Sequence, residues 1–163
     1  MVFGMSLSTY TTVHVIISLI AIVTGFIAVF GMLQSRRMAG WTAIFLWMTV
    51  LTSVTGFLFP FAGVTPGIIV GIISMVLLAI AFFALYGKHL DVAWRWVYVW
   101  TAIAALWFNV FILIVQLFQK IAFLNALAPT GSEPPFQIAQ GAALVLFAAL
   151  AIMAVRNFHP RAA

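Results

Sequence analysis

Long apolar stretches alternate with short charged or polar breaks along this chain. Charged residues stand at Arg36, Arg37, Lys88, Asp91, Arg95, Lys120, Glu133, Arg156 and Arg161. A membrane-spanning helix needs roughly 20 consecutive apolar residues, and the intervals between these charges fit five such helices. We therefore predict helices at 10–34, 41–61, 66–87, 95–119 and 135–156 within a single all-α transmembrane domain.

The second and third helices are predicted from turn-forming residues because no charge separates them. The uncharged interval 38–87 is too long for one span. Pro60, Gly63 and Pro66 lie near its middle, and proline and glycine are typical of tight connections. We expect a short hairpin between two antiparallel helices here.

Composition strengthens the membrane assignment. Of the 163 residues, 66% are hydrophobic and 6% are charged, whereas about a quarter of the residues in a soluble domain are charged. Such a chain lacks the polar surface that a soluble globular protein needs. It also contains no cysteine, which excludes disulfides, thiolate catalysis and cysteine-ligated metal centres.

The distribution of the basic residues predicts the orientation. With five alternating spans, six of them fall on one side, namely Arg36, Arg37, Lys88, Arg95, Arg156 and Arg161, and Lys120 alone falls on the other. Cytoplasmic loops are enriched in lysine and arginine, so we expect the N-terminus outside and the C-terminus in the cytoplasm. The formal net charge of +5 is scattered over short segments, which argues against nucleic-acid binding.

Small and polar residues recur at helical spacing in the first three predicted helices. They are His14, Ser18, Ala21, Gly25 and Ala28 in the first, Thr42, Thr49, Ser53 and Gly56 in the second, and Gly67, Gly71 and Ser74 in the third. Small residues let helix backbones approach closely in a bilayer. We interpret these faces as packing seams.

Polar side chains of the fourth predicted helix indicate either interhelical hydrogen bonds or a cavity. Amides at membrane depth are costly unless they are bonded, so we expect Asn109 and Gln116 to bond to neighbouring helices. The alternative is a polar cavity that opens outward, because several polar residues share the outer depth. The candidate ligand-binding or proton-handling residues are His14, Asn109, Gln116, Lys120, Glu133, Gln137 and Gln140.

The connection from Lys120 to Phe136 is the longest in the chain. Its apolar first half predicts a segment that lies in the membrane interface. Ser132 and Glu133 precede the fifth predicted helix, and the side chain of either can cap its first turn. Alternatively, Glu133 is the counter-charge of Lys120 or of a protonated His14 at the mouth of the outer cavity.

Several segments resemble the uncharacterised small polytopic proteins of bacterial inner membranes. They are Trp94-Arg95-Trp96-Val97-Tyr98, Trp107-Phe108-Asn109, Gln116-Leu117-Phe118-Gln119-Lys120 and Glu133-Pro134-Pro135-Phe136. The resemblance implies a helical membrane fold and a location in the bacterial inner (cytoplasmic) membrane. It implies no mechanism, because those proteins have no assigned activity.

Three functional hypotheses follow, and none invokes a catalytic motif. In the first, a non-enzymatic protein binds a hydrophobic ligand, a membrane lipid or a partner membrane protein through the candidate residues. In the second, the chain is a subunit of a homo-oligomeric transporter or channel. There His14 and Glu133 handle protons or cations, and Asn109 lines the path.

The third hypothesis is an electron-transfer subunit that binds haem or quinone. Histidine is a common axial ligand of haem, but His89 and His159 fall at the cytoplasmic ends of helices, far from His14. That spacing disfavours a haem held by two histidines of one chain. The alternatives are a haem on His14, a haem shared between subunits, and a quinone beside Trp107 and Phe111. His14 and Glu133 alone are too few ligands for a metal ion.

Overall fold

The computed structural model describes residues 4–60, 63 and 65–160. Five of its helices are long and apolar enough to cross a membrane. The helices are α1 (Leu7–Leu33), α2 (Ala39–Phe57), α3 (Pro66–Phe82), α4 (Val92–Lys120), the short α5 (Ala122–Leu127) and α6 (Pro134–Asn157). All five predicted helices are confirmed, with ends shifted by a few residues. Phe61, the predicted last residue of the second helix, and the basic Arg161 lie outside the described residues.

Local capping explains where two of the helices begin. The Ser6 side chain accepts a hydrogen bond from the backbone N–H of Thr9 and starts α1. Thr65 accepts from Ile68 in the same way at the start of α3, and Pro66 occupies the first helical position. Hydroxyl side chains satisfy the free N–H groups of a first turn, and proline is well suited to that position. The connection between α2 and α3 therefore ends where the sequence predicts.

α3 runs directly into a π-helical turn, η1 (Phe83–Gly87). The N–H of Lys88 bonds to the carbonyl of Phe83, five residues back. His89 and Leu90 follow with positive φ angles of 50° and 61°. The chain thus reverses within a few residues to enter α4.

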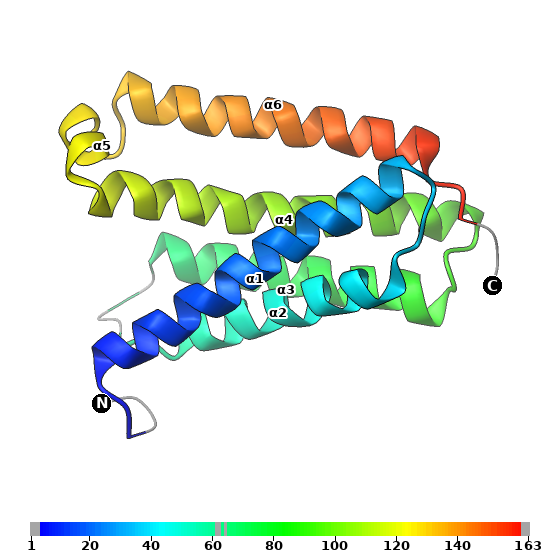
Figure 1. Ribbon diagram of the computed structural model, residues 1–163, viewed down its shortest axis with the longest axis horizontal. Helices are drawn as coiled ribbons and strands as arrows, with labels where there is room; N and C mark the ends of the chain where they lie inside the picture. Colours follow the sequence, from blue (N-terminus) through cyan, green and yellow to red (C-terminus); the bar gives the residue numbers. More distant parts are fainter. Residues whose placement is uncertain (1–3, 61–62, 64, 161–163) are drawn as a thin grey trace.

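α4 is the central helix of the bundle. It packs against α3 and α6 along its length, and α1 crosses it obliquely while packing along α2 (Figure 1). We call the end at which α1 begins the N-terminal end of the bundle. The basic side chains Arg36, Arg37, Lys88, Arg95 and Arg156 belong to the opposite end, and Lys120 belongs to the N-terminal end.

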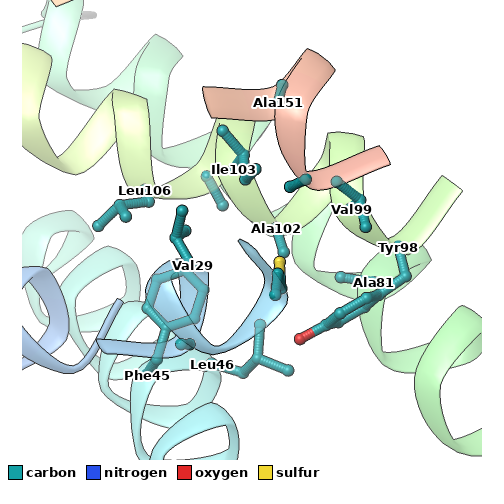
Figure 2. Packing of buried hydrophobic residues seen from close by; sticks show 14 of the residues in the cluster. Val29, Phe45, Leu46, Ala81, Tyr98, Val99, Ala102, Ile103, Leu106 and Ala151 are labelled. Carbon is teal, nitrogen blue, oxygen red and sulfur yellow. The ribbon is translucent and has the colours of Figure 1, made fainter. Parts of the chain in front are cut away.

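The hydrophobic core fills the half of the bundle away from the N-terminal end. Figure 2 shows side chains from five helices meeting there, among them Val29, Phe45, Leu46, Ala81, Tyr98, Val99, Ala102, Ile103, Leu106 and Ala151. Each of them is at most 2% exposed. Three of these ten are alanines, which let the backbones approach closely.

Gly25 marks the place where α1 crosses the other helices. A Cβ atom added there would lie 2.5 Å from Leu106 Cδ1 and 2.9 Å from Phe45 Cδ2. The predicted packing seam of α1 divides at this level. Ala21, Gly25 and Ala28 are buried, whereas His14 and Ser18, which are nearer the start of α1, are only partly buried.

Candidate functional site

A cavity of about 490 Å³ lies between α1, α2, α3 and α4 in the half of the bundle nearer the N-terminal end. Its polar lining residues are Thr11, His14, Ser18, Thr52, Ser53, Ser74, Asn109, Gln116 and Lys120, and its aromatic ones are Phe57, Phe59 and Phe108. Among the described residues, those lining the cavity include none from α5 or α6. The remaining lining is glycine and aliphatic side chains.

The cavity exists because α1 and α4 diverge from their contact at Gly25 toward the N-terminal end (Figure 1). The lining residues Val15 and Leu19 of α1 are 42% and 44% exposed, and Leu117 of α4 is 37% exposed. The cavity therefore reaches the outer surface of the bundle along α1 and α4. His14 and Ser18, predicted to pack in a seam, line this space instead.

His14 is held by a hydrogen bond that determines its tautomer. Its Nδ1 lies 2.7 Å from Thr55 Oγ1 on α2. The Thr55 hydroxyl in turn lies 2.6 Å from the carbonyl of Leu51 and donates its only proton there. Nδ1 must therefore donate to Oγ1. In the neutral imidazole Nε2 is then an acceptor, and within the described chain no donor bonds to it.

Two aromatic side chains support this arrangement. The Phe59 ring meets the His14 ring edge to face, with centroids 5.2 Å apart. The Tyr10 hydroxyl donates to the carbonyl of Thr55 over 2.7 Å. α1 and α2 are thus joined by two hydrogen bonds at one residue of α2.

Asn109 is held deeper in the cavity by a similar pair of hydrogen bonds through a threonine of α2. Its Nδ2 donates to Thr49 Oγ1 over 3.1 Å, and Thr49 donates to the carbonyl of Phe45 over 2.9 Å. This confirms the predicted interhelical bond of Asn109. Because the threonine proton is already used, the amide must present its nitrogen to α2, which leaves Oδ1 as an acceptor without a donor among the described residues.

Gln116 lines the cavity, but the hydrogen bond predicted for it to a neighbouring helix is wrong. Gln116 is exposed and bonds to no other residue in the part of the chain that the structure describes. It lies where α1 has already diverged from α4, so no partner is within reach. Lys120, one turn further along α4, is also exposed and makes no ion pair with a described residue.

Two serines facing the cavity were assigned to packing seams by the sequence pattern. Ser53 and Ser74 are only 7% and 3% exposed, and both line the cavity. A helical serine commonly bonds to the carbonyl four residues back, yet neither hydroxyl has a partner within the described residues. Their spacing alone does not distinguish this role from packing.

Glu133 lies outside the cavity, and its carboxylate forms hydrogen bonds within the turn before α6. Its carboxylate accepts hydrogen bonds of 3.0 Å from the backbone N–H groups of Thr130 and Ser132. It occupies the N-cap position of α6 but makes no side-chain bond to the first turn. The predicted cap by its side chain and the predicted ion pair with Lys120 or His14 are both wrong, because this turn already engages both carboxylate oxygens.

The other two candidates bond elsewhere. Gln137 Nε2 donates to the carbonyl of Ser132 over 2.7 Å. Gln140 Nε2 donates to the carbonyl of Phe111 over 3.1 Å and so joins α6 to α4. The structure therefore brings His14, Asn109, Gln116 and Lys120 to one cavity, and leaves Glu133, Gln137 and Gln140 outside it.

The described part of the chain shows no group of three or more histidine or acidic side chains that could hold a metal ion. No family model, curated protein or solved structure matches the chain. The length and apolar composition of its five long helices identify an integral membrane protein.

Proposed function

We propose that this protein is a non-enzymatic membrane protein that binds one hydrophobic ligand, such as a lipid, in the cavity between α1 and α4. The observation that carries the proposal is the cavity itself. Its volume of about 490 Å³ lies within the range of small-molecule sites, which are apolar pockets with a few polar groups. His14, Asn109, Ser53 and Ser74 supply such groups here.

The bilayer is the natural source of the ligand. The helices that enclose the cavity have the length and composition of membrane spans. Its exposed lining residues Val15, Leu19 and Leu117 are aliphatic, so a molecule entering along them exchanges one apolar surrounding for another. With the basic end of the bundle in the cytoplasm, the cavity faces the outer leaflet of a bacterial inner membrane.

The positions of the candidate residues favour ligand binding over proton or cation transport. The transport hypothesis relies on His14 and Glu133 acting together, and Glu133 bonds to the loop before α6 instead. A quinone is one member of the hydrophobic class proposed here. The electron-transfer hypothesis therefore differs from the proposal only in the identity of the ligand, which would be a quinone.

Native mass spectrometry of protein released from mild detergent tests the proposal. Gly56 lines the cavity, and a Cβ atom there would meet only His14 Cε1, at 3.6 Å. Gly56→Leu therefore places side-chain atoms in the cavity. Gly40→Leu is the matched control, because Gly40 is on the same helix and a Cβ there meets nothing within 4 Å.

We expect the wild type and Gly40→Leu to retain the same non-protein mass and Gly56→Leu to lose it. The protein is first reconstituted in vesicles of phosphatidylethanolamine and phosphatidylglycerol that also contain diacylglycerol, so that phospholipids and a neutral lipid are offered to every variant. Equal retention by all three proteins, or none by the wild type, would contradict the proposal.

A further inference from the structure

The two polar side chains held against α2 inside the cavity both offer hydrogen-bond acceptors. His14 bonds to Thr55 and Asn109 bonds to Thr49. Each threonine donates its proton to a carbonyl of its own helix, so each can only accept from the residue facing it. His14 Nε2 and Asn109 Oδ1 are therefore left as acceptors.

These two acceptors select against ligands that carry only acceptor oxygens. A carboxylate, a phosphate, an ester or an ether can accept from Ser53 or Ser74, but it leaves both of these acceptors without a donor, and a buried acceptor without a donor is costly. A hydroxyl group supplies the missing proton. Its oxygen can also accept from Ser53 or Ser74, because a serine hydroxyl donates as well as accepts.

Charge gives a second, independent restriction. Lys120 is the only charged side chain among the described lining residues. It is eleven residues from Asn109 on α4, which corresponds to about 16 Å along the helix. An anionic headgroup that pairs with Lys120 would therefore stay at the N-terminal end and would bring no proton to either acceptor.

We propose that the ligand of this cavity is a neutral lipid alcohol, whose hydroxyl group donates to His14 Nε2 or Asn109 Oδ1. Its hydrocarbon part leaves the cavity between α1 and α4, past Val15 and Leu117. This proposal rests on the proposed function, because it requires that the cavity binds a hydrophobic ligand.

Three ligands with the same hydrocarbon chain test it, namely hexadecanol, hexadecyl methyl ether and hexadecanoic acid. Their affinities for the protein are measured by native mass spectrometry titration. One hydrogen bond is worth about 1 kcal/mol, so we expect hexadecanol to bind at least about fivefold more tightly than the ether. The preference should disappear in His14→Phe combined with Asn109→Leu. It should persist in Gln119→Leu, on the same helix but outside the cavity.

A second measurement does not depend on variants that alter the bundle. Hexadecanol added to wild-type protein should shift the ¹⁵N resonance of His14 Nε2 or of the Asn109 side-chain amide, and the ether should shift neither. Equal binding of alcohol and ether overturns the hydroxyl assignment. If hexadecanoic acid binds most tightly and Lys120→Met loses that binding, the assignment of a neutral ligand is overturned. Both outcomes leave ligand binding intact, whereas failure of the Gly56→Leu comparison removes the proposed function itself.

Discussion

His14 on α1 donates a hydrogen bond from Nδ1 to Thr55 Oγ1 on α2 over 2.7 Å. The direction of this bond follows from the Thr55 hydroxyl, which donates its only proton to the carbonyl of Leu51. One threonine thereby joins two helices and leaves Nε2 as the acceptor of the neutral imidazole. Such control of a tautomer by the partner of the other ring nitrogen is a general property of histidine.

Replacing Thr55 should remove the hydrogen bond that selects one tautomer of His14. Thr55→Val keeps the shape of the side chain but leaves Nδ1 without an acceptor. We expect the neutral His14 to become a mixture of Nδ1-H and Nε2-H forms, observed in the ¹⁵N shifts of the ring. Thr52→Val serves as the control, because the Thr52 hydroxyl bonds only to Met48. An unchanged Nδ1-H form in Thr55→Val would show that the threonine does not set the tautomer.

Gly25 should not tolerate a side chain. In Gly25→Ala the new methyl group would overlap Leu106 and Phe45, both 0% exposed and closely surrounded. Overpacking of this kind costs about 1 to 3 kcal/mol. We expect lower stability in equilibrium unfolding in mixed micelles.

The control for Gly25→Ala is Gly141→Ala on α6, where a Cβ meets nothing within 4 Å. Alanine is a better helix former than glycine by about 0.5 to 1 kcal/mol, so this variant should be at least as stable as the wild type. If the two variants had equal stability, the close crossing at Gly25 would be refuted.

Glu133 should make the loop between α5 and α6 sensitive to acid. Desolvation acts to raise the pKa of its carboxyl, but the N–H groups of Thr130 and Ser132 outweigh it and hold the pKa below the ordinary value of 4.5. Its stabilising effect is therefore complete above that value and is lost as the pH falls through the lower folded-state pKa.

Amide hydrogen exchange of Thr130 and Ser132 measures this effect. Protection of both amides should decrease as the pH falls below 4.5, beyond the intrinsic pH dependence of exchange. Glu133→Gln removes the titrating group, so in this variant the protection of the Thr130 and Ser132 amides should not depend on pH in this range, apart from the intrinsic pH dependence of exchange. Ligand retention should be unaffected by Glu133→Gln, since Glu133 lies outside the cavity. Loss of the ligand in this variant would support the transport hypothesis instead.

Orientation can be tested directly because the chain contains no cysteine. Ser8 is exposed near the start of α1, and Gln34 is exposed at its other end. The excess of basic residues at the Gln34 end predicts that this end is cytoplasmic. In intact cells, a membrane-impermeant maleimide should label Ser8→Cys and not Gln34→Cys. The reverse pattern would place the cavity toward the cytoplasm.

The sequence by itself determined the five helices and the connections between them. Whether a segment spans a bilayer depends on its own length and hydropathy, and turns such as Thr65-Pro66 act within a few residues. The interhelical bond of Asn109 was also predictable, because an amide at membrane depth needs a partner. The partner itself, Thr49, was not predictable from these local properties.

Only the tertiary structure decided which polar residues share a cavity. Ser18 and Gly25 belong to the same small-residue face of α1, yet one lines the cavity and the other forms the closest crossing. The difference depends on the angle at which α1 passes α4. That angle is set by contacts such as the one between Gly25 and Leu106, which are far apart in the sequence. Glu133 likewise bonds to its own turn and not to Lys120, because the backbone places two N–H groups closer than the cation.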